Sequence, residues 1–344
     1  QIDRTSKDRA RNRYKKKLRR LAILWFQSGS GTEKYKMKDV YSVAGITKQA
    51  HFKECHSQAL LNHRVQELVI NVDLIRKAHP GCGLEKMYRT LKPDFIGRDK
   101  FIEIMMSLGY RVKQNKNYKR TTYAGLINFP NLITGMLLWS KNQMWQSDIT
   151  YIEAGGRFYY LVMIIDVYTK EIIGYALSNH MRASANIAAL EMAIAANPGS
   201  LKELIHHSDK GSQYTAHQYL QLLHQNGITP SMGIKGQDNA YAEKLNSTIK
   251  NEYLKYRNTT TEKELKAAVR QAIKNYNQSR IHNSLPCNYT PKSFANCLLS
   301  LDYPQRPKVI VYTDGKQKVK DVSNILDFLP HKDQKAPVCP IIYN

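Results

Sequence analysis

The sequence has no apolar run that approaches the roughly 18 residues needed to span a membrane, and its start does not resemble a signal peptide. Its five cysteines are scattered, odd in number and without a Cys-x-x-Cys pair, so we expect no disulfide framework. Three histidines and one cysteine gather between residues 51 and 63, but the second cysteine pair of a zinc module is missing. These absences favour a soluble intracellular protein without structural zinc.

Acidic residues are also scarce. The 344 residues include 28 Asp and Glu against 52 Lys and Arg, which gives a net charge of +24. This excess is larger than solubility requires, and it predicts a polyanionic partner whose binding weakens steeply with salt. An anionic membrane would satisfy the charge, but the lack of an apolar segment favours nucleic acid over a membrane partner. The length allows two or three domains.

The N-terminal part has the pattern of a DNA-binding region. Residues 4–20 hold ten basic side chains and one acid, which fits either a solvated tail or a DNA-contacting arm. A helix-turn-helix pattern follows at 37–58, with Gly45 in the turn and Thr47 as the cap of a recognition helix at 48–58. We expect this helix to contact DNA through three side chains: Lys48, Gln49 and His51.

A second helical module follows the first. The pattern predicts an amphipathic helix at 65–78 and a helix pair at 83–91 and 98–108. Residues 111–120 then form a basic link, which either tracks DNA phosphates or serves as a flexible spacer. The basic side chains expected to meet DNA in this link are Lys113, Lys116, Lys119 and Arg120.

The stretch from residue 145 to residue 282 organises the rest of the chain. Three consecutive runs have the composition of short strands, the second of them buried on both faces: 145–152, 158–165 and 171–177. Ala154-Gly155-Gly156 predicts the first turn. Asp148 lies in the middle of the first strand, on the face opposite to Trp145. A charged side chain in this setting needs a partner, and a metal ion would serve.

Two further acids complete a candidate site. Asp209 stands where a predicted strand at 203–207 passes into a glycine-bearing loop, the usual place for a site residue in an open α/β sheet. Glu243 lies on a helix predicted at 240–256, which Asp238-Asn239 would cap. Three converging carboxylates would hold two Mg²⁺ ions roughly 3.5–4 Å apart for phosphodiester chemistry. Basic and polar side chains expected to meet DNA here are Lys210, Lys235, Asn239 and Lys250.

Two other acids compete for the site. Asp166 ends the second strand and enters a turn, where an acid more often caps the backbone. Asp238 could replace Glu243 as the third ligand, but it is well placed as a helix cap. We prefer Glu243, because it shares its helix face with Lys250, a residue suited to a phosphate.

The segments WQSDITYI, HHSDKGSQY and KGQDNAYAEKLNSTIKNEY, followed by YNQSRIHNSLPCNYTP, resemble the catalytic core of the insertion-sequence transposases that share the retroviral-integrase fold. That core is an RNase H-like domain. The resemblance implies that Asp148, Asp209 and Glu243 are the metal-binding catalytic triad, with two Mg²⁺ or Mn²⁺ ions per active site. It leaves open whether Arg280 and His282 contact DNA or support the acids.

The resemblance implies a bacterial, nucleoid-associated cytoplasmic enzyme that cuts the 3′ ends of its element and joins them to target DNA, as a homo-oligomer on double-stranded DNA. A structure-selective nuclease and a non-catalytic DNA-binding regulator are the alternatives. The expected fold is multidomain, with all-α helix-turn-helix modules, a central α/β RNase H-like core and a small β-rich appendage. The predicted order is a basic arm (1–36), a helix-turn-helix module (37–64), a second helical module (65–110), a basic linker (111–143), the core (144–298) and the tail (299–344).

Overall fold

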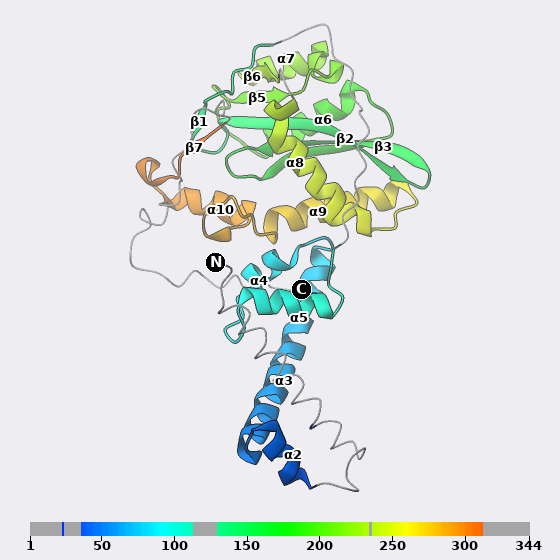
Figure 1. The fold of residues 1–344 in the computed structure, drawn as a ribbon. Helices are drawn as coiled ribbons and strands as arrows, with labels where there is room; N and C mark the ends of the chain where they lie inside the picture. The colour runs from blue at the N-terminus through cyan, green and yellow to red at the C-terminus, as the bar shows by residue number, and fades with distance from the viewer. Residues whose placement is uncertain (1–22, 24–35, 113–128, 234–235, 312–344) are drawn as a thin grey trace, which may run out of the picture. The chain divides into compact units, whose positions relative to one another are not determined.

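The computed structural model describes residues 23, 36–112, 129–233 and 236–311, and the chain divides into two compact units, Gln1–Val72 and Asp73–Asn344. Figure 1 labels most of the strands and helices. None of the described helices is long and apolar enough to cross a membrane.

The first unit contains the turn expected at Gly45. Helix α2 (Met37–Ala44) ends there, and Gly45 has the left-handed φ of 63° that favours glycine. The Thr47 hydroxyl accepts a hydrogen bond from the Ala50 amide at 3.1 Å, as a cap of the next helix should. Tyr41 and Ala44 pack with Ile23 in a small apolar cluster.

Helix α3 (Lys48–Ala78) is much longer than the recognition helix expected at 48–58. It contains neither glycine nor proline, so nothing in the sequence stops it before Pro80 and Gly81. The helix expected separately at 65–78 is its second half. The predicted boundary between residues 64 and 65 therefore falls inside one helix.

Two short helices follow α3 in the second unit. They are α4 (Leu84–Leu91) and α5 (Arg98–Ser107), close to the bounds that the sequence predicted. Met87, Phe101 and Met105 are fully buried. The guanidinium of Arg76 donates hydrogen bonds to the carbonyl oxygens of Pro80, Cys82 and Tyr110, which ties the end of α3 to both ends of this helix pair.

The centre of the second unit is a mixed five-stranded sheet in the order β4-β3-β2-β5-β6. Its first three strands form the expected antiparallel meander: β2 (Met144–Ala154), β3 (Arg157–Asp166) and β4 (Ile172–Ser178). Gly155 and Gly156 make the first turn with φ of 55° and 73°, as a tight hairpin requires. The other two strands, β5 (Ile205–Ser208) and β6 (Thr229–Met232), run parallel to β2 and to each other.

Helices cover both faces of this sheet (Figure 1). One apolar cluster packs against α6 (Ala183–Ala195) and α7 (His217–Gln225), and the other against α8 (Ala240–Thr248) and α9 (Glu262–Gln278). Strand β3 contributes Val162 and Ile164 to the first cluster and Leu161 and Met163 to the second. The prediction of a strand buried on both faces is therefore confirmed.

A third cluster closes one end of the core. Ile133 and Leu138 are fully buried there beside Phe294 of α10 (Pro291–Cys297), and β1 (Leu137–Leu138) pairs with β7 (Val309–Ile310). Part of the stretch expected as a linker thus packs into the core. Short 3₁₀ turns complete the unit: Ser212–Thr215, Gly236–Asn239, Leu254–Tyr256, Pro286–Asn288, Leu298–Ser300 and Tyr303–Gln305. Most of the predicted β-rich tail lies outside the described residues.

Candidate active site

Two of the three predicted acids stand at the point where β2 and β5 part. The last paired residues of these parallel strands are Ser147 and Ser208. One step further along each strand come Asp148 and Asp209, so the two carboxylates are carried by adjacent positions of the sheet. Strand β2 continues beyond this point, whereas β5 ends and the chain turns into the loop that contains Gly211. The edge of β2 is therefore open toward the site.

Glu243 reaches the same region from the first turn of α8. The side chain of Gln146 positions this helix, because its amide oxygen accepts hydrogen bonds from the backbone amides of Tyr241 and Ala242 at 3.2 and 3.3 Å. Its amide nitrogen donates to the carbonyl oxygen of Asp238 at 3.0 Å. A residue two positions before Asp148 thus caps the helix that carries Glu243.

The cap expected from Asp238-Asn239 is corrected by these contacts. Asn239 occupies the N-cap position, but no side-chain hydrogen bond caps the helix from there. The Asn239 amide instead donates to the carbonyl oxygen of Ser147 at 3.0 Å, and the Asp238 carboxylate accepts from Asn131 at 3.1 Å. The backbone amides of the first turn point at β2, so a strand residue satisfies them.

Hydrogen bonds orient the two aspartates. The Asp148 carboxylate accepts from its neighbour Ile149 N at 2.8 Å and from the Asn246 amide at 2.9 Å. Asp209 accepts from Gly211 N at 3.1 Å. The loop after Asp209 is held to β2 by Tyr214, whose hydroxyl lies 3.0 Å from the Ser147 hydroxyl. Each carboxylate therefore has a defined direction before any ligand binds.

The three acids interact electrostatically. Burial raises the pKa of Asp148 to about 7, with further contributions from the negative charges of Asp209 and Glu243. Burial and the charge of Asp209 also raise the pKa of Glu243. Such mutual repulsion is relieved by a bound cation or by a proton.

Carboxylate oxygens are the ligands that Mg²⁺ and Mn²⁺ prefer, so the donor chemistry and the excess negative charge of this cluster fit a divalent ion. Within the described part of the chain, no three His, Cys, Asp or Glu side chains are placed closely enough to form a ready metal site. The triad is a cluster of interacting acids rather than a closed cation cage.

The raised pKa of Asp148 predicts a pH-dependent stability. Because the folded state binds this proton more tightly than the unfolded state, the stabilising contribution is full at low pH and is lost as the pH rises through about 7. We expect the melting temperature of the protein in a chelator to fall between about pH 5 and pH 8 more steeply than that of Asp148→Asn. Parallel melting curves for the two proteins would contradict a shared negative cluster.

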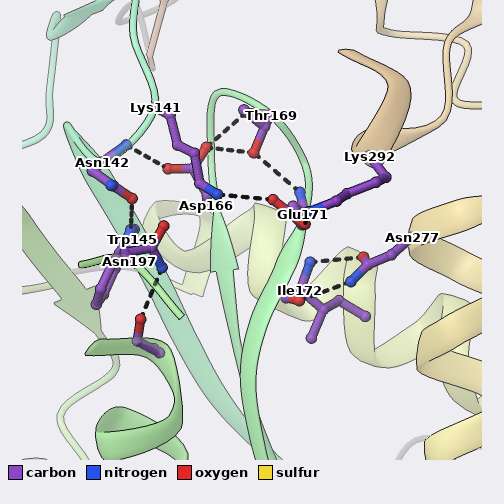
Figure 2. A network of polar contacts seen from close by, with 11 residues as sticks. Lys141, Asn142, Trp145, Asp166, Thr169, Glu171, Ile172, Asn197, Asn277 and Lys292 are labelled. Carbon is purple, nitrogen blue, oxygen red and sulfur yellow. Dashed lines mark hydrogen bonds and ion pairs between the residues drawn. The ribbon is translucent and has the colours of Figure 1, made fainter. Parts of the chain in front are cut away.

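Asp166, the competing acid, is a turn residue. Its carboxylate accepts hydrogen bonds from Asn142 N at 2.8 Å and from both the amide and the hydroxyl of Thr169 at 2.7 Å (Figure 2). Lys141 pairs with the nearby Glu171 at 3.0 Å in the same network. The capping role that the sequence favoured for Asp166 is confirmed.

The side chains proposed to bind DNA fall into three groups. Lys48 and Gln49 are exposed, and Lys210 and Lys250 are partly exposed, the latter with its ammonium 4.2 Å from the centre of the Tyr151 ring. His51 and Asn239 are 7% and 3% exposed, which places them in the scaffold rather than at a DNA surface. The remaining predicted contacts lie outside the described residues: Lys113, Lys116, Lys119, Arg120 and Lys235.

Two residues of the site had no strong sequence signal. Asn246 follows Glu243 by three positions and so lies near it on one helix face, and Gln146 precedes Asp148 by two positions in the strand. In the sequence, the available clue was a polar side chain at these spacings from Glu243 and Asp148. His207, which precedes Asp209 by two positions, is buried with its ring 2.9 Å from the Ser231 hydroxyl, and burial lowers its pKa to about 4.

The segment after α9 contains Arg280 and His282, whose roles the sequence left open. Arg280 is 6% exposed and forms two hydrogen bonds with the Glu252 carboxylate, at 2.8 and 2.9 Å. His282 lies edge-on to Tyr276, and its backbone amide donates to the carbonyl oxygen of Tyr289. In this structure Arg280 and His282 therefore make packing contacts within the second unit. The sequence had left open whether they contact DNA or support the acids.

Comparison with known families places the site in context. Two models described as integrase core domain match residues 140–238 and 226–291. Together these spans contain Asp148, Asp209 and Glu243.

Curated relatives extend the similarity beyond the core. An uncharacterised 31 kDa protein of insertion element IS600 from Shigella sonnei is 36% identical over 207 residues, which cover 58% of this chain and 75% of the relative. The transposase of insertion sequence element IS629 from the same organism is 34% identical over 223 residues, covering 63% and 74% of the two chains. Among solved structures, the HTLV-2 integrase catalytic core domain in complex with magnesium matches 48% of this chain and 99% of its own, with 20% identity and a TM-score of 0.37.

Proposed function

Because this chain belongs to the insertion-sequence transposases with an integrase-like core, we propose that it binds the ends of its element, cuts their 3′ strands and joins them to target DNA. The observation that supports this proposal is the electrostatic interaction of Asp148 with Asp209 and Glu243 near the point where β2 and β5 part. Acids that repel one another at an open sheet edge, two of them with a raised pKa, suit the transfer of a phosphodiester.

The reaction comprises two in-line displacements at phosphorus. Water attacks first and frees a 3′-hydroxyl, and this hydroxyl then attacks a phosphodiester of the target strand. In both steps the bond to the leaving oxygen breaks as the new bond forms, so no Ser or Tyr nucleophile is needed. The contribution of the protein is to hold the reacting groups in line and to balance charge.

Asp148, Asp209 and Glu243 are the residues that would hold divalent metal, Mg²⁺ or Mn²⁺, with two ions per site. When bound, these ions supply charge neutralisation at the reacting phosphate and lower the pKa of an attacking oxygen. The chain keeps the aspartates directed toward the site through Asn246 and Gly211. Gln146 holds the first turn of α8, and with it Glu243, against the same strand.

DNA contacts would come from both units. Lys210 and Lys250 flank the acids in sequence and are suited to backbone phosphates near the cut. Lys48 and Gln49, exposed at the start of α3, are suited to reading an element end. Two ends must be joined in one event, so we propose a homo-oligomer on DNA. We also propose that the reaction takes place in the bacterial cytoplasm, at the nucleoid, because DNA is its substrate.

The test is a joining assay with the purified full chain. Labelled DNA with the ends of the element would be incubated with target DNA and Mg²⁺ or Mn²⁺, with wild type beside Glu243→Gln. We expect cleaved and joined products from wild type alone. Nicking without joining would favour the structure-selective nuclease, and end binding without a metal-dependent product would favour the regulator.

A further inference from the structure

A second set of charged side chains lies away from the triad, at the end of α8, the helix that carries Glu243. After α8 the chain continues through a π-helical turn, Ile249–Tyr253, in place of the regular α-helix expected to residue 256. Glu252 lies in this turn, and Arg280 binds both of its carboxylate oxygens. Lys86 of α4 also donates to it at 3.5 Å. A helix that precedes the core in sequence is thus paired with the helix that carries Glu243.

The backbone seals the same contact. The Gly81 amide donates to the carbonyl oxygen of Glu252 at 2.7 Å. A Cβ atom on Gly81 would lie 2.5 Å from the Cα of Glu252 and 2.8 Å from the carbonyl oxygen of Asn251. Only glycine allows the turn before α4 to approach the helix this closely.

Neutral hydrogen bonds surround the charged group. The His79 ring lies 2.8 Å from the Tyr253 hydroxyl through one nitrogen and 3.1 Å from the Ser279 hydroxyl through the other. Burial, and then the charge of Arg280, lower the pKa of His79 to about 4, so its ring is neutral and has one donor and one acceptor for these partners. The Asn275 amide adds a bond to the carbonyl oxygen of Ala78 at 2.6 Å.

The charged neighbours of Glu252 favour its ionised form. Burial raises its pKa, but the hydrogen bonds and charges of Arg280 and Lys86 outweigh burial, so the pKa is lower than usual. Loss of the carboxylate charge would leave Arg280, which is 6% exposed, buried without its counter-ion.

The π-helical turn gives this contact a consequence for catalysis. A π-turn contains one residue more than an α-turn, and each residue turns a helix by about 100°. Conversion of the π-helical turn to a regular α-helix would therefore rotate α8 relative to the 3₁₀ turn Leu254–Tyr256 that follows. Glu243 and Tyr253 lie on opposite sides of this change. The contacts of Glu252 and Tyr253 hold the turn in its present form.

We propose that Glu252 is a positioning residue for strand transfer, which seats α4 and α5 on the π-helical turn and thereby sets the direction of Glu243. The proposal rests on the function proposed above. It makes α4 and α5 part of the catalytic unit, in place of the separate DNA-reading module that the sequence predicted. Removal of residues 1–110 would then impair cleavage as well as end recognition.

The test compares Glu252→Gln with wild type in the full chain. We expect amide hydrogen exchange in α4, the π-helical turn and α8 to accelerate about 10-fold or more, with β3 still protected. Joining at saturating DNA should slow by about 10-fold, while the Kd for element ends changes less than about twofold. Glu85→Gln is the matched control, because Glu85 forms an exposed ion pair with Arg89 on the same helix, and it should change neither readout.

Two results would overturn the proposal: unchanged exchange in α4 and the π-helical turn, or faster exchange there with normal joining. If β3 also loses protection in Glu252→Gln, Lys86→Met replaces it, since this partner is partly exposed and its bond is longer. An inactive wild type would refute the proposed function instead. Hydrogen exchange in α8 would still decide whether Glu252 holds the catalytic helix.

Discussion

Asp209→Asn should lower the rates of both cleavage and joining by about 1,000-fold or more, with nearly unchanged binding of element ends. The amide is close to the carboxylate in size and can still accept the hydrogen bond from Gly211 N, so the loop after β5 should keep its conformation. What disappears is one negative charge at the position next to Asp148. The measurement is a single-turnover assay with labelled ends, beside a binding titration.

The matched control is Asp99→Asn, which removes the same charge from an exposed position on α5 where the carboxylate pairs with neighbouring Arg98. We expect its activity to equal that of wild type. Loss of DNA binding in Asp209→Asn would mean that this acid supports the fold of the loop. Retained joining would remove Asp209 from the catalytic triad.

Gly174→Ala should have the largest effect on stability, a loss of about 3 kcal/mol in the free energy of unfolding. Gly174 lies in β4 beneath α6, where an added Cβ atom would stand 2.1 Å from the carbonyl oxygen of Ala189 and 2.9 Å from the Cβ of Ala193. The first of these is backbone, so relief requires the whole helix to move away from the sheet. Urea denaturation followed by circular dichroism measures the loss.

Gly83→Ala is the control for this substitution. Gly83 has φ of −72°, and no atom lies within 4 Å of the position that its Cβ would take. We expect a loss of less than about 1 kcal/mol there, because Gly83 is the N-cap of α4, where alanine is less favourable than glycine. Equal losses in the two variants would show that the packing of α6 on β4 is looser than the described contact.

The sequence led to the acids of the site for a local reason. Alternating side chains, a glycine turn and an acid at a strand end are written in consecutive residues, so these local patterns suffice to place Asp148 and Asp209 on neighbouring elements. The helix pattern after Asp238-Asn239 added Glu243, and the resemblance to a transposase family then implied that the three acids form one triad. Similarity to curated insertion-element proteins, one of them a transposase, confirmed that family. The roles of the three acids remain a proposal, which the substitutions above test.

Supporting contacts escaped prediction because they join residues far apart in the chain. Gln146 caps a helix that begins nearly a hundred positions later, and Glu252 pairs with Lys86 across a still longer interval. Neither side chain differs in sequence pattern from an ordinary surface residue. Asp238-Asn239 illustrates the converse, since a good local cap lost its role to a strand residue that packing brought closer.

The sequence by itself determined the strands of the meander, the basic character of the chain and the positions of its candidate acids, because composition and short-range periodicity act within a few residues. Only the tertiary structure decided that Arg280 pairs with Glu252, and that Lys86 of α4 reaches the same carboxylate in the turn after α8. Those outcomes depend on which buried charges and backbone groups find partners. Two such groups pair when the fold brings them close in space, and patterns within a few residues of the sequence do not show which distant residues will meet.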